Sequence, residues 1–433
     1  MDIDDINFFQ DQATIADPHP YFEELRAQCP IRRENHHQVM MVTGYDEAIE
    51  IYNDTQKFSS CIAVTGPFPG FPVPITGDNI SDLIVEHRDK LPMSDQLPTL
   101  DPPTHTDHRA LLMRMITPKR LKENEDSMWR LCDVALDRFF ASDNADFISG
   151  FASPFTLLAI TDLLGVPQDD LDDFIHGLQH RPPSDGAIGN ADKEMSHSPL
   201  EFLYERLCRY VEMRRAKPAG DVLTGMAQAT FPDGSTPEPI DVARVAANVF
   251  AAGQETTVRL LAASLRLLGD NPELQAQLRA DRSLIGNFIE ETLRLESPIT
   301  GDFRLSVVPT TVGGIDMPAG TTVMLINGSA NRDPRHFSDP LTFDASRANA
   351  RQHLSFGRGV HTCPGAPLAR AETRIALERL LDRTTDIRIS EAKHGAPGAR
   401  KFRYAPSFIL RGLTTLHLEF TMADQAPSPS AEA

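Results

Sequence analysis

The stretch Phe356-Gly357-Arg358-Gly359-Val360-His361-Thr362-Cys363-Pro364-Gly365 decides how this chain folds and what it can bind. Its glycines and its proline predict a tight loop that presents one thiol, and a helix is expected to begin directly afterwards, at Ala366. A thiol just ahead of a helix N-terminus lies near the positive end of the helix dipole, which favours the thiolate. Thiolates bind soft metals and ligate haem iron, whereas a lone cysteine is usually an inert core residue. The residues that flank Cys363 must therefore decide between these two interpretations.

Helices are predicted on both sides of this loop. Apolar residues recur at three- and four-residue spacing almost continuously from His105 to Pro298, and again after the loop. The expected helices cover residues 118–140, 200–215, 241–268, 283–295 and 366–382, with an earlier one that begins at Asp46. The expected strands are 31–34 and 38–42, paired as a hairpin, and 310–315 and 321–326. The predicted fold class is mainly α, with small β-sheets.

No linker divides the chain into separate domains. We expect a flexible N-terminal segment over residues 1–17, one large domain over 18–421 and a disordered tail over 422–433. Residues 59–103 are too rich in proline and glycine for regular structure, and connections of this length usually bind something or are disordered. The phenylalanines in this segment favour binding.

Composition excludes several classes of function. The 433 residues include 61 acidic residues against 42 Lys and Arg, a net charge of −19, which argues against binding nucleic acid or an anionic membrane. Five scattered cysteines without a CxxC pair fit neither a disulfide framework nor a zinc ribbon. No run of 18 apolar residues occurs, and the acidic start Met1-Asp2-Ile3-Asp4-Asp5 is unlike a secretory signal. We therefore expect a cytoplasmic monomer without a membrane span.

Two further motifs lie on the predicted helices. Glu291 and Arg294 are three residues apart, so they share a helix face and can pair, although such a pair is most often only a solvated surface contact. Ala252-Gly253-Gln254-Glu255-Thr256-Thr257 lies in the middle of the 241–268 helix. Glycine and threonine are poor helix formers, so propensity alone predicts a break at this run. A threonine can also bond back to a carbonyl one turn earlier and open the helix locally.

Taken together, these motifs resemble those of the cytochrome P450 superfamily, the haem-thiolate monooxygenases. The loop matches every fixed position of the family pattern FGxGxHxCxG, and the run on the 241–268 helix is similar to the family's oxygen-binding motif A-G-x-D/E-T. The resemblance extends from about Pro18 to Phe420 and is nearest to the soluble bacterial members. It implies the triangular cytochrome P450 fold, haem b as cofactor and dioxygen as co-substrate.

The resemblance implies roles for the residues around the expected haem. Cys363 is the axial ligand to the iron, Gly253 lets the oxygen helix pass close to the haem, and Thr256 hydrogen-bonds dioxygen. Glu255, in place of the commoner aspartate, relays protons. The loop residues Phe356, Gly357 and Gly365 shape the cradle of the cysteine.

Four basic residues match the groups that hold the haem propionates in the family. His105 and Arg109 follow Asp101-Pro102-Pro103 and form one pair; Arg304 and His361 form the other. A planar guanidinium suits a carboxylate, and a histidine adds one hydrogen bond.

A second network is implied to be structural. Glu291 and Arg294 are joined by Arg347, from the loop ahead of the cysteine, and the three fix the geometry of that loop without taking part in chemistry.

The substrate pocket implied by the resemblance lies on the face of the haem opposite Cys363. Most of its residues are apolar, which fits a site that binds chiefly by burial. Asn248 is the exception: it either hydrogen-bonds a substrate oxygen or is satisfied by a neighbouring backbone group. The expected pocket residues are Phe68, Phe71, Val73, Asn248, Ala251, Ala252, Thr300, Phe303, Phe408 and Ile409.

The leading hypothesis is a monooxygenase that hydroxylates or epoxidises an apolar molecule of terpenoid, steroid or aromatic size. The chain carries no FMN, FAD or iron–sulfur motif, so we expect electrons from a separate ferredoxin or flavodoxin and its NAD(P)H-dependent reductase. The alternatives are a peroxygenase that uses hydrogen peroxide, a haem sensor or carrier without turnover, and a helical scaffold without a cofactor. The basic residues expected to dock the electron carrier are Arg114, Lys119, Arg120, Arg351, Arg358 and Arg370.

Overall fold

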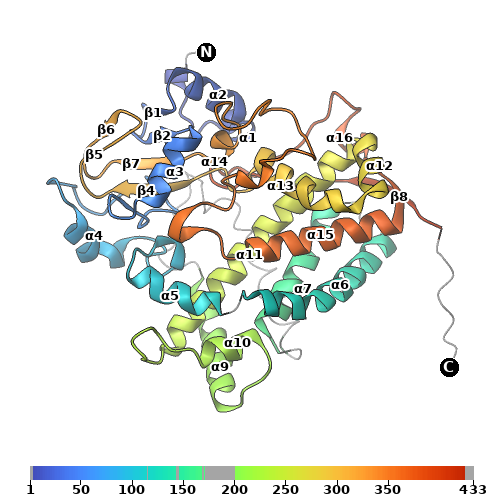
Figure 1. The fold of residues 1–433 in the computed structure, drawn as a ribbon, viewed down its shortest axis with the longest axis horizontal. Helices are drawn as coiled ribbons and strands as arrows, with labels where there is room; N and C mark the ends of the chain where they lie inside the picture. The colour runs from blue at the N-terminus through green and yellow to red at the C-terminus, as the bar shows by residue number, and fades with distance from the viewer. Residues whose placement is uncertain (1–2, 115, 143–145, 168–169, 171–199, 425–433) are drawn as a thin grey trace.

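A long central helix, α11, organises the molecule. The computed structural model describes residues 3–114, 116–142, 146–167, 170 and 200–424. Helix α11 (Pro239–Gly269) runs through the middle of the structure, with a β-sheet on one side and the helices α6, α7 and α15 on the other (Figure 1). Its start is fixed by Pro239 in the first turn and by a capping box between Glu238 and Asp241. The helix is continuous over 31 residues, so the break that propensity predicts at 252–257 does not occur.

The other helices pack around α11 and confirm the predicted mainly α fold class. The predicted helices agree with the observed ones to within a few residues. The longer helices are α2 (His19–Gln28), α3 (Tyr45–Asn53), α5 (Thr104–Met113), α6 (Pro118–Ala141), α7 (Ser153–Leu164), α9 (Glu201–Ala216), α12 (Pro272–Ala280), α13 (Ile285–Glu296) and α15 (Ala366–Arg383). The shorter ones are α1 (Gln12–Ala16), α4 (Ser81–His87), α10 (Val222–Ala227), α14 (Asn327–Ala330) and α16 (Glu391–His394).

The main sheet has five strands in the order β1-β2-β7-β4-β3. Its strands are β1 (Ile31–Arg33), β2 (Met40–Val42), β3 (Phe58–Ser59), β4 (Asp302–Ser306) and β7 (Thr322–Leu325). The predicted hairpin is present as β1 and β2, with Ile31 opposite Val42. Strand β4 pairs with β7 and places Phe303 and Arg304 at the edge of the helical part of the molecule. This strand therefore carries two of the predicted site residues on a rigid element.

Two small two-stranded sheets complete the fold, and one of them corrects a predicted strand. Residues 310–315 are not one strand: β5 (Thr310–Val312) and β6 (Ile315–Met317) pair with each other across a turn at Gly313 and Gly314. Both glycines have positive φ, 54° and 79°, which a side chain would oppose. The third sheet pairs β8 (Thr384–Ile389) with β9 (Leu418–Met422).

The N-terminal segment differs from the expectation of a flexible 1–17. From residue 3 onward it folds onto the core: the side chains of Phe8 and Phe9 are 0% and 1% exposed. Residues 59–103 also contain more structure than predicted, namely α4 and two 3₁₀ turns. Of the predicted tail, residues 425–433 lie outside the described part of the chain.

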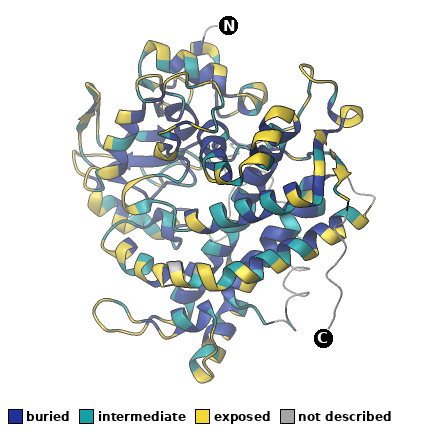
Figure 2. Cartoon of the chain, turned by 45° about the vertical axis from the view of Figure 1, so that its right-hand side comes forward, coloured by how far each residue is buried: buried dark blue, intermediate teal, exposed yellow. Residues whose placement is uncertain are grey.

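Burial follows the helical periodicity, with exposed residues on the outer faces of the surface helices and buried ones toward α11 (Figure 2). None of the helices in the described ranges combines the length and the apolar character that crossing a bilayer requires.

Candidate functional site

The cysteine loop is a backbone cradle at the start of α15. The backbone N–H of Cys363 donates to the carbonyl of Phe356 at 2.8 Å, which closes the loop on itself. Gly359 has φ 68°, and a Cβ there would lie 2.4 Å from the carbonyl oxygen of Tyr52, so this position requires glycine. A Cβ built on Gly365 would approach Cys363 Sγ to 3.8 Å. The loop thus lies tightly against α3 and presents its one thiol directly ahead of α15.

The surroundings of the Cys363 thiol have opposing effects on its acidity. Burial raises its pKa and is the largest influence, while the backbone N–H groups of Gly365 and Ala366 and the guanidinium of Arg109 lower it. The same N–H donors and the same cation stabilise a thiolate once a positive metal ion is bound to it. The site therefore has the hydrogen-bond donors that a thiolate ligand to iron needs.

The four predicted propionate ligands come from three separate segments and gather beside the cysteine. The rings of His105 and His361 lie 4.0 Å apart between centroids. Arg109 donates to the carbonyl of Thr362, next to Cys363. Arg304 donates to Asp302 Oδ1 at 3.0 Å and lies near enough to both histidines to affect their acidity.

Both histidines of this cluster are held in the neutral form. Burial lowers the pKa of His105 to about 4, with a further contribution from Arg109. Burial and the charge of Arg304 lower the pKa of His361 to about 2. Among the described residues, neither ring nitrogen of His105 has a hydrogen-bond partner, although the residue is only 2% exposed. Arg109, Arg304 and His361 already have polar partners, whereas the buried His105 lacks an acceptor that a carboxylate beside the thiol would supply, so these residues fit the propionates of haem b.

The motif on α11 forms a continuous accessible stretch in a helix whose flanking turns are largely buried. Residues 251–256 are partly or fully exposed, whereas Ala246, Ala247 and Thr257 on either side are buried. The Thr256 hydroxyl donates to the Ala252 carbonyl at 2.7 Å, the back-bond expected for this sequence. An ideal Cβ at Gly253 would lie 3.5 Å from Ile160 Cδ1, so the space that this glycine leaves free borders α7.

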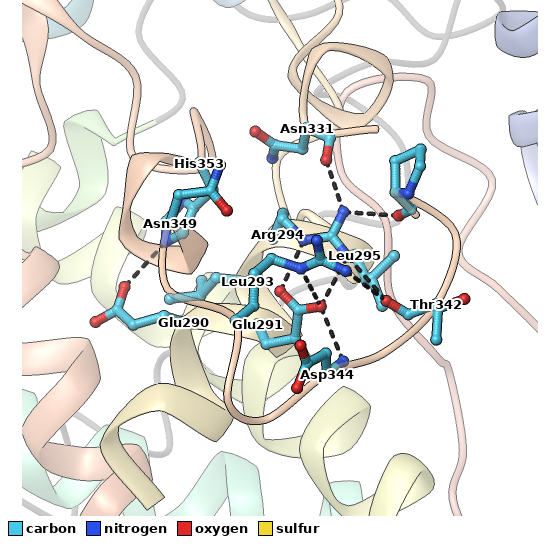
Figure 3. Close-up of polar contacts among 12 residues, drawn as sticks. Glu290, Glu291, Leu293, Arg294, Leu295, Asn331, Thr342, Asp344, Asn349 and His353 are labelled. Atoms are coloured by element: carbon cyan, nitrogen blue, oxygen red, sulfur yellow. Dashed lines mark hydrogen bonds and ion pairs between the residues drawn. The ribbon is translucent and has the colours of Figure 1, made fainter. Parts of the chain in front are cut away.

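The predicted network of Glu291, Arg294 and Arg347 is present and buried. Figure 3 shows Glu291 and Arg294 with their contacts to Asp344 and Asn331. Arg294 makes a bidentate pair with Glu291 at 2.7 and 2.8 Å, and Arg347 Nε donates to Glu291 Oε1 at 2.9 Å. The backbone N–H of Asp344 donates to the same oxygen at 3.1 Å. Arg294 also donates to the carbonyl of Asn331 at 2.9 Å. The three side chains thereby tie α13 to the segment that leads into the cysteine loop.

We expect Arg347→Met to destabilise the haem-loaded protein by about 3–5 kcal/mol, because it leaves the Glu291 carboxylate short of a partner in the core. Urea unfolding followed by haem absorbance measures this. The matched control is Arg282→Met, which removes a surface pair with Asp382 at 3.0 Å and should cost at most about 1 kcal/mol. Equal losses of stability in the two variants would contradict a structural role for the network.

The predicted pocket residues fall into two groups. Phe68, Phe303 and Phe408 lie in one aromatic cluster, with centroids 5.8 Å apart for Phe68 and Phe408 and 6.1 Å for Phe303 and Phe408. A Cβ at Gly66, where φ is 62°, would lie 2.6 Å from the Phe303 ring, so this glycine lets the loop lie on that ring. Thr300 and Ile409 are also buried, and the backbone N–H of Thr300 donates to the Ile409 carbonyl at 2.7 Å.

The remaining predicted pocket residues are more accessible. Phe71 and Val73 in the 59–103 segment are half-buried, as are Asn248 and Ala251 on α11, and Ala252 is exposed.

Sequence reasoning missed several contacts of the site. Phe9 packs edge-on against Phe408 at 5.0 Å, and Ser60 Oγ lies 3.0 Å from His361 Nε2. The Tyr52 hydroxyl donates to Asp302, the acid that orients Arg304. Each of these contacts joins residues far apart along the chain, and no local pattern marks them.

Comparison with known proteins agrees with the site. The family model named Cytochrome P450 matches residues 209–385. The cytochrome P450 monooxygenase PikC of Streptomyces venezuelae is 31% identical over 95% of this chain and 93% of that protein. The cyclomarin C epoxidase CymV of Salinispora arenicola is 30% identical over 89% of this chain and 95% of that protein.

Solved structures agree as well. Substrate-free CYP150A6 of Mycobacterium marinum superposes with a TM-score of 0.90 at 50% identity, covering 98% of this chain and 100% of that one. CYP109E1 of Bacillus megaterium, in complex with corticosterone, superposes with a TM-score of 0.77 at 26% identity, covering 94% and 98%. The similarity to these proteins covers nearly the whole chain, both in sequence and in structure. The protein therefore belongs to the cytochrome P450 superfamily of haem b-dependent monooxygenases.

Proposed function

We propose that this cytochrome P450 inserts one oxygen atom of dioxygen into a C–H or C=C bond of an apolar molecule of terpenoid, steroid or aromatic size, in the cytoplasm. The observation that carries the proposal is the gathering of the Cys363 thiol and four basic side chains near the start of α15, including His105, whose ring nitrogens have no hydrogen-bond partner in the described part of the chain. When bound, the haem would supply the redox chemistry that activates dioxygen, with Cys363 holding the iron through its thiolate. The protein supplies orientation, protons and a dry pocket.

Each part of the site has a task in this proposal. Cys363 binds the iron, and the N–H groups of Gly365 and Ala366 stabilise its thiolate. Arg109 and Arg304 hold the propionates, and His105 and His361 each donate a ring N–H to them. The Thr256 hydroxyl donates a hydrogen bond to the Ala252 carbonyl, so its oxygen lone pairs remain to accept a hydrogen bond from another donor in the site. Glu255 holds and passes on the protons that the reaction consumes.

The proposed substrate class is supported by the aromatic residues that the structure gathers and by the relatives. Phe68, Phe303 and Phe408 pack in one apolar cluster, in which Phe303 and Phe408 are 0% and 2% exposed and Phe68 is half-buried, so Phe68 is the member that can contact an apolar substrate. Solved structures of CYP109E1 carry corticosterone and testosterone in that protein. Asn248 is a half-buried polar group on the helix that carries Thr256, and we assign it to a substrate oxygen.

The test is product formation by the haem-loaded protein with a surrogate ferredoxin, its reductase, NADPH and a panel of apolar compounds under ¹⁸O-labelled dioxygen. Compounds that bind should first change the haem spectrum as the iron loses its water ligand. One labelled oxygen atom in the product supports the proposal. Turnover with hydrogen peroxide but none with dioxygen and electrons would overturn it in favour of a peroxygenase.

The proposed electron donor is a separate acidic carrier, and we assign its docking to those of the expected basic residues that are exposed. Arg370 makes a bidentate contact with the buried Glu290, at 2.6 and 2.9 Å, and is committed to the core. Arg120 donates to the carbonyl of Gly220, and Lys119 pairs with Glu123. The exposed arginines beside the cysteine loop are Arg114, Arg351 and Arg358.

We expect Arg114→Glu combined with Arg358→Glu to slow reduction of the haem by the carrier about tenfold or more at low salt, because both charges steer association. Stopped-flow reduction at several salt concentrations measures the effect, which should fade as ionic strength rises. The matched control is Arg388→Glu, an exposed residue of β8 that should leave the rate unchanged. A wild-type rate that does not depend on salt would contradict docking by charge.

A further inference from the structure

The acid of the oxygen motif is paired with a cation on its own helix. Arg259 Nη2 bonds to Glu255 Oε1 one turn earlier on α11. The two ends of this pair lie in different surroundings: Arg259 is buried, at 8% exposure, whereas the Glu255 side chain is 37% exposed. An exposed pair of this spacing contributes little because both side chains move freely. Here one partner is held by the core.

The C-terminal segment holds Arg259 in place. The backbone of Gly412 lies so close that a Cβ there would be 2.5 Å from Arg259 Cγ and 2.8 Å from Nη1. Gly412 is anchored in turn, because its carbonyl accepts from the N–H of Ala405 at 3.0 Å. A small cavity of about 10 Å³ adjoins Arg259 and is lined also by Arg266, Tyr404 and Arg411. The guanidinium is thus confined between α11 and this segment.

A confined guanidinium restricts the carboxylate that it binds. The planar fork of an arginine fixes direction as well as distance, and it loses little freedom on pairing when its own position is already set. Glu255 lies in a partly exposed stretch of helix, and the fork of Arg259 limits the rotamers that its carboxylate can adopt. Proton transfer depends on such positioning, since small displacements of the donor cost large factors in rate.

We propose that Arg259 is a positioning residue that fixes Glu255 for proton delivery, and that Gly412 is glycine because the backbone must lie directly on Arg259. The inference rests on the proposed function, in which Glu255 relays protons. It adds to that proposal that Arg259 holds the relay residue Glu255, and that the segment around Gly412 holds Arg259. Arg259 acts only through Glu255.

The test compares Arg259→Met, Arg259→Lys and Glu255→Gln in the haem-loaded protein. The readouts are the rate of NADPH-driven dioxygen consumption with a surrogate ferredoxin and its solvent deuterium isotope effect, both without added substrate and with testosterone as a probe. We expect Glu255→Gln and Arg259→Met to slow consumption about tenfold or more and to enlarge the isotope effect. Arg259→Lys, which keeps the charge but not the fork, should recover part of the rate.

The matched control is Arg266→Met, which breaks the buried pair of Arg266 with Glu296 (2.6 Å) further along the same helix. Both methionine variants should lose stability on thermal unfolding, but only Arg259→Met should slow proton delivery. Gly412→Ala offers a second route, since it displaces Arg259 while leaving every charge in place. It should reproduce the enlarged isotope effect.

The outcomes separate the inference from the proposal on which it rests. If Glu255→Gln slows consumption and enlarges the isotope effect but Arg259→Met does neither, the positioning role of Arg259 is overturned. If Glu255→Gln itself behaves like wild type, the relay role of Glu255 in the proposed function fails. A Gly412→Ala variant with wild-type kinetics would overturn the role given to Gly412.

Discussion

Cys363→Ser should abolish the red-shifted carbon monoxide band of the reduced haem protein and reduce monooxygenase turnover below detection. A serine hydroxyl at this position cannot supply the thiolate that the iron requires. The loop itself should survive, because the hydrogen bond that closes it runs between the backbone N–H of residue 363 and the carbonyl of Phe356. The measurement is the difference spectrum between the carbon monoxide complex and the reduced protein, together with haem content and circular dichroism.

The matched control for this variant is Cys61→Ser. Cys61 is 1% exposed, belongs to an apolar core cluster and lies outside the cysteine loop, so it serves as a core cysteine for comparison. The control should keep the red-shifted band. If the red-shifted band survives in Cys363→Ser, the assignment of Cys363 as the ligand is wrong. Loss of the band in Cys61→Ser alone would then point to Cys61.

Thr256→Ala should uncouple NADPH consumption from product formation. Without the Thr256 hydroxyl, the site loses the hydrogen-bond acceptor beside Glu255. Protons are therefore delivered to the reaction less selectively. We expect NADPH consumption to continue while product per NADPH falls by about 10²-fold, a value at the lower end of what positioned proton transfer contributes. The hydrogen peroxide released should account for most of the missing product.

A suitable control removes the same kind of back-bond elsewhere. Thr161 on α7 donates to the Leu157 carbonyl at 2.8 Å, in the geometry of the contact between Thr256 and Ala252. Thr161→Ala should leave the ratio of product to NADPH at the wild-type value. Thr256→Ala with normal coupling would contradict the role given to its hydroxyl.

Local patterns in the sequence predict the elements that build the site. The helices α11 and α15 follow from apolar periodicity, and the cysteine loop follows from glycines and a proline at fixed spacing around one thiol. The pairing of Glu291 with Arg294 follows from a separation of three residues on a helix. Each of these features depends on neighbours within a few residues, which is the range that sequence reasoning covers well.

Predictions failed where packing between distant segments decides the outcome. A break at 252–257 is what propensity favours, but the helix stays continuous because its flanks are buried against α7, α13 and α15. Phe9 is buried because Phe303 and Phe408 come from other parts of the chain to cover it. The contact between Arg259 and Gly412 likewise joins residues more than a hundred positions apart. The predicted strand 310–315 failed for a different reason. The Gly313-Gly314 pair is a local turn signal, and it divides the segment into β5 and β6.

The most direct test of the account is a crystal structure of the protein loaded with haem. The account predicts that Cys363 Sγ binds the iron and that the two propionates accept hydrogen bonds from Arg109, Arg304, His105 and His361. In that structure the ring nitrogens of His105 should acquire the partner that they lack among the described residues. An iron bound by any other residue, or propionates that point away from this basic cluster, would contradict the account.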